Sequence, residues 1–511
     1  MQYTGDGGPY LIPQTGLGTR SWENGFFAQD DFRVTQRLTL NLGLRYDILT
    51  WPVEVENRQA NFDLVTGALI VAGSNGASRT LIPDDYHNFG PRVGFAYRLT
   101  DDGKTVVRGG YGLFYFIDRG GIANQLAQNP PFAGVNSATY ATGARITFSG
   151  SLPCEPTCTQ AQLIATNATG TLPSGSFSGL DLAAPTGVSV IADLPTNLTP
   201  MVSQWNLQVQ RSLGTNQSVS LAYVGTHGAH LTRNYNANQQ LFDSPAGTEF
   251  FPDLGGSITT QDNRGKSDYH SLQAQYERRL TKGLQFLGSF TWSKTIDDAC
   301  GAIDTCQPQL YADYKLERGP SNQDQPYRLV LSSLPFGKGK RWAGNITRPL
   351  DFVIGGWQLN GIYVLQAGQP FSVTVDGSPS STRADVTGSI GVNPGGLTSY
   401  ITETWSASNA AIGPFTIPAS AGGVFIAPGT SGRDILRGPG SSNIDLSLFK
   451  NFAVTEKIKG QFRVQAYNLT NTPHFANPNT DLSQGPNQFG RITSTIPFTY
   501  RQMELGLHFT F

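Results

Sequence analysis

Charged residues are scarce in this chain of 511 residues. They make up 14% of the sequence, against roughly 25% in soluble domains. The 36 basic side chains nearly balance the 37 acidic ones. A nucleic-acid-binding protein normally carries a basic excess, so we expect no nucleic-acid partner. This low content of charged residues, together with 11% aromatic residues and 59 glycines, favours β-sheets whose outer face contacts an environment other than water. A large secreted β protein is the alternative.

Long hydrophobic runs are also lacking. No stretch approaches the roughly 18 to 20 apolar residues that a membrane-spanning helix requires. The opening residues, MQYTGDGGPYLIPQTG, lack the basic start and apolar core of a signal peptide. Because the features below indicate an exported protein, we expect the true N-terminus to lie upstream of this sequence.

Cysteine is rare, with four residues in two local pairs, Cys154/Cys158 and Cys300/Cys306. A structural zinc site needs four ligands, and neither pair has a second pair or a histidine nearby in sequence. Local disulfides within each pair fit an oxidising compartment such as the periplasm or the cell surface. We therefore predict disulfides and no metal site.

What the sequence does have is a two-residue alternation of apolar and polar side chains. At its end, Met503, Leu505, Leu507, Phe509 and Phe511 alternate with polar or small residues. The stretches LTLNLGLRYD, VGFAYRL, LQAQYERRL and IKGQFRVQAY show the same pattern. Successive side chains of a strand point to opposite faces, so each stretch predicts a strand with one apolar face.

We predict thirteen strands, most of them close to the length that a tilted strand needs to cross a bilayer. They cover about 25–34, 38–49, 89–99, 104–117, 202–213, 216–227, 268–280, 284–296, 326–335, 353–366, 441–453, 457–468 and 500–511.

The connections between these strands alternate between short and long. The long ones are rich in small and polar residues and cover about 50–87, 118–201, 228–267, 297–325, 376–440 and 469–499. Short turns on one side and long loops on the other are typical of a bacterial outer-membrane β-barrel, with its loops outside the cell. A basic connection at 336–352 is the exception, because it is long where a short turn is expected.

An odd number of strands is unexpected, because single-chain bacterial barrels have an even number and both termini in the periplasm. We therefore expect residues 1–511 to be a partial barrel domain that does not close on itself. Open strand edges would leave backbone groups unpaired in lipid, at several kcal/mol each.

The polar strand faces should line the lumen, and their larger members are Arg45, Arg98, Arg108, Gln208, Gln210, Glu277, Arg279 and Arg463. Catalysis is not predicted, since adjacent acids such as Asp30 and Asp31 point oppositely on a strand. We expect no enzyme activity and no cofactor.

Four stretches, GFFAQDDFRVTQRLTLNLGLRYD, NFGPRVGFAYRL, RGGYGLFY and QAYNLTNTPHF, resemble the barrel of TonB-dependent receptors, with the Oar-like group as the closest match. The resemblance implies a 22-stranded antiparallel transmembrane barrel, of which these would be the last thirteen strands. It places the plug domain and the box that contacts TonB upstream, absent from this sequence. It also implies that the barrel assembly machinery reads the final strand, with Met503, Leu505, Leu507, Phe509 and Phe511.

The resulting hypothesis is a TonB-dependent receptor or transporter in the outer membrane of a Gram-negative bacterium. It would contact outer-membrane lipid, TonB through the plug region and an unidentified extracellular ligand. Two alternatives remain: a surface adhesin or assembly barrel without active transport, and a passive porin.

Overall fold

A computed structural model describes most of the chain. The described residues are 10–11, 18–117, 122–130, 132, 135–136, 182–183, 185, 189–194, 198–245, 248–281, 284–298, 307–311, 313–334, 357–377, 379, 382–394, 396–453 and 458–510. No helix within them has the length and hydropathy required to cross a membrane. The helices there are short 3₁₀ turns: η1 (Ile122–Gln128), η2 (Pro252–Leu254), η3 (Tyr314–Glu317) and η4 (Leu482–Gln484).

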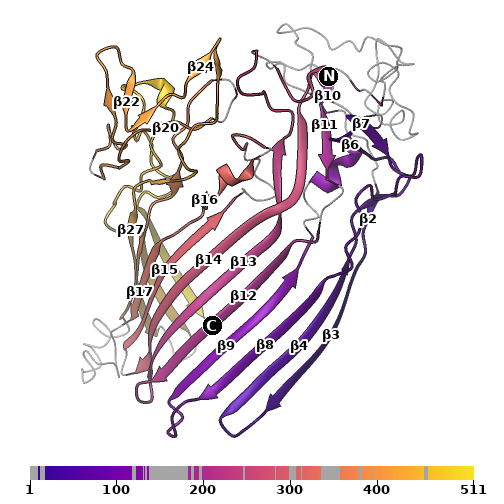
Figure 1. Cartoon of the computed structure of the whole chain (residues 1–511). Helices are drawn as coiled ribbons and strands as arrows, with labels where there is room; N and C mark the ends of the chain where they lie inside the picture. Colours follow the sequence, from indigo (N-terminus) through magenta and orange to yellow (C-terminus); the bar gives the residue numbers. More distant parts are fainter. Residues whose placement is uncertain are drawn as a thin grey trace.

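The main element is a 15-stranded sheet (Figure 1). Thirteen strands form its path, each antiparallel to its neighbours: β3 (Glu23–Arg33), β4 (Leu38–Leu49), β8 (Phe89–Arg98), β9 (Thr105–Tyr115), β12 (Met201–Ser212), β13 (Gln217–Asn236), β14 (Ile258–Thr281), β15 (Leu284–Asp297), β17 (Tyr327–Leu334), β18 (Trp357–Gln366), β27 (Ser441–Ala453), β28 (Lys459–Tyr467) and β29 (Gln502–Thr510). β11 (Val190–Asp193) runs parallel to β14, and β16 (Gly319–Pro320) lies beside β15. All thirteen predicted strands are confirmed.

The sheet curls but does not close. Its path begins at β29 and ends at β3, and no pairing joins these two strands among the described residues. In Figure 1, β27 lies behind the nearer strands, so the viewer looks at the convex face. The expectation that the sheet does not close on itself is confirmed for the described residues.

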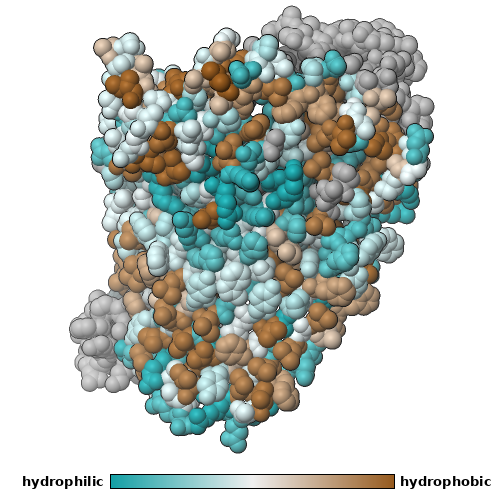
Figure 2. Space-filling view, viewed as in Figure 1, coloured by the Kyte–Doolittle hydropathy of each residue, from teal (hydrophilic) through white to brown (hydrophobic). Residues whose placement is uncertain are grey.

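Apolar side chains cover the convex face of the sheet. Leu207 on β12 pairs with Tyr223 on β13, and Leu42 on β4 pairs with Val93 on β8. These side chains are exposed, Leu207 to 50%. Figure 2 shows hydrophobic residues gathered on the lower half of this face. Such an extended apolar surface requires a nonaqueous environment, and lipid supplies it.

The buried cores lie in the long connections rather than inside the sheet. We call the first the β6–β7 module, which packs Phe62, Leu69, Val190, Tyr235, Leu254 and Ile258. We call the second the β20–β25 module, which packs Phe371, Val373, Tyr400, Phe415, Leu436, Leu482 and Phe489. Figure 1 places the two at the same end of the sheet. A smaller cluster joins Trp51, Ile82 and Leu126.

Short strand pairs organise these connections. They are β1 (Tyr10–Leu11) with β10 (Val135–Asn136), β2 (Thr19–Arg20) with β5 (Val53–Glu54), β6 (Ala60–Asp63) with β7 (Ala68–Val71), β19 (Pro370–Phe371) with β26 (Leu436–Arg437), β20 (Asp385–Val386) with β23 (Phe415–Thr416), β21 (Thr404–Trp405) with β22 (Ala411–Gly413), and β24 (Ser420–Ala421) with β25 (Val424–Phe425).

The expected loop over 228–267 is wrong at both ends. β13 continues to Asn236 and β14 already begins at Ile258, so the two strands form a ribbon beyond the apolar belt. The pairing is irregular between Gly228 and Leu231 and again between Leu231 and Arg233. A strand segment that lies outside lipid needs no apolar face. The alternation of apolar and polar residues in β13 and β14 therefore ends where these strands leave the apolar belt. The unusual 336–352 connection lies outside the described residues.

The two faces of β12 should respond differently to charge. We expect Leu207→Arg to destabilise the folded state by about 2–4 kcal/mol, because it places a guanidinium in the apolar belt. Gln208→Arg on the opposite face should cost less than about 1 kcal/mol. Urea unfolding in phospholipid vesicles would measure both. Equal losses for the two variants would contradict the assignment of faces.

Candidate functional site: the concave face and its loop modules

The concave face of the sheet is polar, as the alternation predicts. Arg108 on β9 lies opposite Gln208 on β12, and its guanidinium donates to Gln210 Oε1 at 2.7 Å. Nearer the same strand ends, Arg279 Nε lies 3.8 Å from Glu277 Oε1. Arg98 donates to the backbone carbonyl of Gln36 in the adjoining turn. These groups satisfy one another while leaving a hydrated wall.

A cavity of about 530 Å³ opens in this wall where β3, β4, β8, β9 and β12 meet. Its floor is backbone, because Gly43, Gly94, Gly110 and Gly112 contribute no side chain. The polar residues around it are Gln29, Asn41, Arg45, Arg92, Gln204 and Asn206. The cavity therefore offers amide and guanidinium donors to a polar or anionic group.

Two arginines at this cavity are held differently. Arg45 Nε donates to Asp47 Oδ1 at 2.8 Å, so its charge is neutralised locally. Arg92 lies over the ring of Phe114, 4.7 Å from its centroid, and has no ion pair among the described residues. Stacking of this kind holds a guanidinium in place without neutralising it. Arg92 is thus the cation that remains available to the lumen at this level.

Ion pairs fix the β20–β25 module to the strand ends. Arg383 Nη1 lies 2.7 Å from Glu317 Oε2, with side-chain exposures of only 6% and 8%. Arg433 and Arg437, also from this connection, pair with Asp297 on β15 and with Asp324 before β17. Removing one partner of a buried pair leaves the other charge uncompensated, which is costly. The module is therefore attached to the neighbouring connection and to the strand ends by these three ion pairs.

Arg383 is also satisfied by backbone carbonyls. Its Nε donates to Ser431 O at 2.9 Å and its Nη2 to Leu316 O at 2.8 Å. Gln309 Oε1 accepts from the Arg383 amide at 2.7 Å. The Arg383 side chain therefore joins two connections, the one between β15 and β17 and the one between β18 and β27.

A second buried network supports the β6–β7 module. Arg233 on β13 makes two hydrogen bonds of 2.7 Å to Asp262 on β14. Its guanidinium lies 3.4 Å from the centroid of the Tyr314 ring. Burial raises the pKa of the Tyr314 phenol, so this ring stays neutral at physiological pH. Aromatic stacking and the carboxylate together hold the arginine.

Sequence reasoning missed these networks because their members are distant in the chain. Glu317 and Arg383 are 66 residues apart, and Asp297 and Arg433 are 136 apart. The one local signal in the sequence was the presence of a few charged residues in connections that otherwise contain little charge. It does not say which acid meets which arginine.

The residues singled out from sequence fall into two groups. Cys154, Cys158, Cys300, Cys306 and Phe511 lie outside the described residues, so their roles stay predictions. Met503, Leu505, Leu507 and Phe509 lie along one exposed face of β29, whose pairing partner is β28. In the described part of the chain, no three His, Cys, Asp or Glu side chains are arranged to hold a metal ion.

Comparison with known proteins agrees with this architecture. A family model described as outer membrane beta barrel domain matches residues 10–504. No curated protein matches the chain in sequence.

Solved structures with a similar fold include the outer membrane transporter YddB from Escherichia coli, at 10% identity and a TM-score of 0.47, covering 96% of this chain and 45% of that one. Another is FpvA of P. aeruginosa bound to heterologous pyoverdines, at 11% identity and a TM-score of 0.44, covering 97% and 39%. A third is the FrpB iron transporter from Neisseria meningitidis, at 10% identity and a TM-score of 0.43, covering 96% and 46%. The chain spans less than half the length of each.

Breaking the buried Arg383–Glu317 pair should destabilise the β20–β25 module. We expect Arg383→Ala to destabilise it by about 3–5 kcal/mol, because Glu317 is left buried and unpaired. Arg279→Ala, at an exposed pair, should cost at most about 1 kcal/mol. Hydrogen exchange of the amides in 371–436 would report the loss in the Arg383 variant, whereas the Arg279 variant, altered at the opposite end of β14, should keep their protection unchanged. Unchanged protection in the Arg383 variant would refute the claim that the pair seats the module.

Glu54 gives a pH-dependent test in the β4–β8 connection. Burial opposes its ionisation, but hydrogen bonds from the Arg58 side chain and from the Arg58 and Glu56 amides prevail and lower its pKa to about 2. Because the pKa of Glu54 is lower in the folded state than its ordinary value of 4.5, ionised Glu54 stabilises the fold at pH values above 4.5. That contribution, on the order of 1–3 kcal/mol, is lost as pH falls toward 2.

We therefore expect amide protection around Glu54 to decline between pH 4.5 and 2 in the native chain. Glu54→Gln should remove most of this pH dependence and lower protection at neutral pH. Glu56→Gln is the matched control, since Glu56 is exposed and lies 3.4 Å from Arg58. Hydrogen exchange across this pH range is the measurement. An unaltered profile in the Glu54 variant would show that another group titrates.

Proposed function

Because the chain belongs to the outer membrane beta barrel domain family, whose model covers residues 10–504, we propose that it forms part of the wall of a TonB-dependent transporter. In this proposal a ligand captured outside the cell crosses the outer membrane through the barrel. The energy comes from the inner membrane through TonB and a plug in the lumen. The residues described here bind and guide, and no covalent chemistry is involved.

The observation that carries the proposal is the pair of open edges. Among the described residues, β3 and β29 each have one neighbour in the sheet, yet both present apolar side chains such as Phe32 and Leu505 to lipid. Unpaired backbone N–H and C=O groups cost several kcal/mol each in hydrocarbon. In this proposal, further strands pair with these edges in the membrane. With the 22 strands expected from the resemblance, the lumen would be wide enough to hold a plug.

The polar wall and the rigid outer modules support the same function. The wall offers donors from Arg92, Gln204 and Asn206 around an open cavity. The modules carry their own hydrophobic cores and are seated by buried ion pairs. A preorganised surface binds a ligand without paying for loop ordering. The stretches that resemble TonB-dependent receptors lie in β3–β4, in β8, in β9, and at the end of β28 with the start of the connection that follows it.

The test uses the intact protein purified from outer membranes in detergent. We expect saturable binding to the purified periplasmic domain of TonB, because the plug region must engage TonB. In planar bilayers we expect no open-channel current, because the lumen is plugged. The matched control is the same protein with its plug region deleted, which should conduct and lose TonB binding.

A steady current from the intact protein without TonB would overturn the proposal in favour of a passive porin. A silent barrel that does not bind TonB would overturn it in favour of an adhesin or assembly barrel. The two measurements together separate the three functions without knowledge of the ligand.

A further inference from the structure

Three glycines in the floor of the lumen-wall cavity are not required by the packing of the sheet. They are Gly43, Gly94 and Gly110, and none of them has a positive φ. The closest contact of an added Cβ atom would be 3.6 Å at Gly43, 3.4 Å at Gly94 and 3.5 Å at Gly110. These are ordinary van der Waals distances, so alanine would fit at each position.

Glycines on the convex face have a packing reason instead. A Cβ atom at Gly109 would collide with the Phe95 ring, and one at Gly225 would collide with the Trp205 indole. Gly112, the fourth glycine of the cavity floor, also lies against a ring. A glycine inside a strand weakens it, and it often marks a bulge or the close approach of a ligand or another backbone. The strand pairs at the three remaining floor glycines show no bulge, which favours close approach from the lumen.

The floor glycines lie next to one another in the sheet. Gly94 on β8 is opposite Gly110 on β9, while Gly43 on β4 and Gly112 on β9 lie on either side of Arg92. We call these four glycines the glycine floor. It forms the base of the cavity of about 530 Å³. Bare backbone over three adjacent strands gives a surface on which a ring can lie face down.

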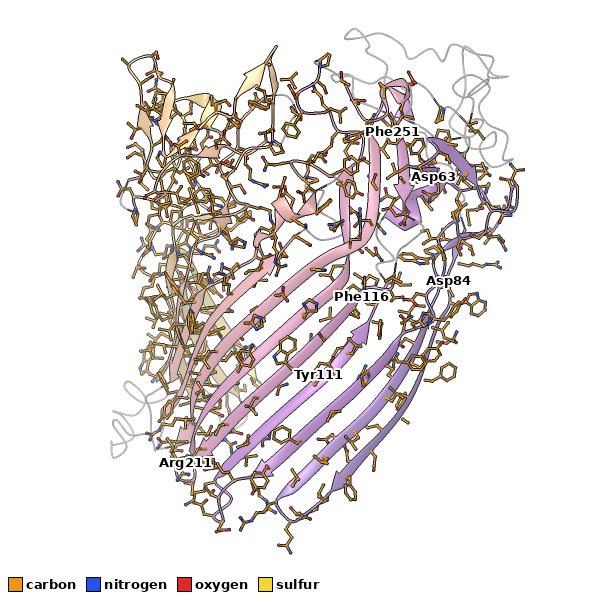
Figure 3. The ribbon with its side chains drawn as sticks, in the orientation of Figure 1. Asp63, Asp84, Tyr111, Phe116, Arg211 and Phe251 are labelled. Atoms are coloured by element: carbon orange, nitrogen blue, oxygen red, sulfur yellow. The ribbon has the colours of Figure 1, made fainter. Side chains whose placement is uncertain are left out.

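The cavity extends toward the loop end of the strands. A smaller cavity of about 170 Å³ shares Arg92 with it and reaches Leu49, at the outer end of β4. Figure 3 shows Tyr111, which separates two floor glycines in the sequence, partway along β9, with Phe116 past the outer end of that strand and Arg211 at the other end of β12. A ligand that arrives from outside the cell therefore meets the smaller cavity first and the glycine floor next.

Unused amide groups surround the glycine floor. The side chains of Gln29, Gln204 and Asn206 line the cavity and make no hydrogen bond with other described residues. A primary amide offers both donors and an acceptor, and a hydroxyl group does the same. Phe27, which also lines the cavity, is 75% exposed on the lumen face. The surroundings therefore suit a ring that carries several hydroxyl groups.

One positive charge completes the site. The acids closest to the floor along β3 and β4 are engaged, since Asp47 accepts from Arg45 at 2.8 Å and Asp31 accepts from Asn41 at 2.6 Å. Arg92 is held by its ring contact alone. A guanidinium matches the two oxygens of a carboxylate with paired hydrogen bonds.

We propose that the glycine floor binds the ring of a hexuronic acid, so that the transported ligand is an acidic oligosaccharide. The sugar ring lies on Gly94 and Gly110, its carboxylate contacts Arg92, and its hydroxyl groups bond to Gln204 and Asn206. An aromatic carboxylate would leave these amides without partners. The inference rests on the proposed transport function and names its substrate class.

Binding to the intact protein in detergent tests the inference. The probes for isothermal titration calorimetry are tetragalacturonate, its fully methyl-esterified form, and citrate as a carboxylate without a sugar ring. We expect tetragalacturonate to bind saturably and the uncharged ester to bind about ten-fold more weakly, because the charge-assisted hydrogen bonds are lost. Citrate at the same concentration should not displace tetragalacturonate.

Variants separate the floor from the charge. Gly110→Ala raises a methyl group from the floor, so both sugars should lose about ten-fold in affinity, while stability in urea should not fall. Arg92→Gln should weaken tetragalacturonate about ten-fold and leave the methyl ester unchanged. The matched control is Gly506→Ala on β29, where an added Cβ atom would meet only the Arg463 Cβ, at 3.8 Å. It should bind both sugars like the native protein.

Four results would overturn the inference: no saturable binding of tetragalacturonate, equal affinity for its ester, displacement by citrate, or native affinity in both variants. A Gly110→Ala variant that keeps native affinity but conducts in planar bilayers would assign the floor to contact with the plug instead. Sugar affinity is measured without TonB, whereas the transport proposal is judged by TonB binding and by the current of the native protein. The two can therefore fail separately.

Discussion

The structure depends on one constraint: within lipid, every backbone N–H and C=O must pair inside the protein. A long antiparallel sheet meets this constraint strand by strand, and it frees the side chains of one face to be apolar. Leu42, Leu207 and Phe290 are exposed for this reason and not because packing failed. Hydrophobic residues that would form the core of a soluble protein here form its surface.

The same constraint moves the charged groups to the ends of the strands. A carboxylate or guanidinium is costly in the belt, whereas the concave face and the strand ends can hold it in water or in pairs. Asp262, Asp297 and Asp324 mark the outer ends of successive strands, and an arginine meets each of them. The loop modules therefore attach where the lipid stops, through charge rather than through continuation of the apolar belt.

Sequence alone predicts the strands because the membrane imposes a period on them. Leu38 to Tyr46 alternate without interruption, and β4 has the predicted bounds. The alternation says nothing about the modules, whose cores join residues such as Phe371 and Leu482 from different connections. It also ends where lipid ends, so the extension of β13 to Asn236 was not visible. The site was predictable only as a polar face. The cavity required the register that places Gly43 and Gly112 on either side of Arg92, and Gly94 opposite Gly110.

The apolar belt of the sheet and the β20–β25 module lie in different solvents, so different residues stabilise them. The belt depends on side chains such as Leu207 and Leu505 against lipid, while the β20–β25 module depends on Phe415 and Tyr400 in a dry core. Substitutions in one should be nearly additive with substitutions in the other, because the groups are distant and share few partners. Arg383, Arg433 and Arg437 are the exceptions, since they join the module to the strand ends. Charged contacts of this kind, together with the Gln309–Gly429 hydrogen bonds, link the β20–β25 module to the neighbouring connection and the strand ends.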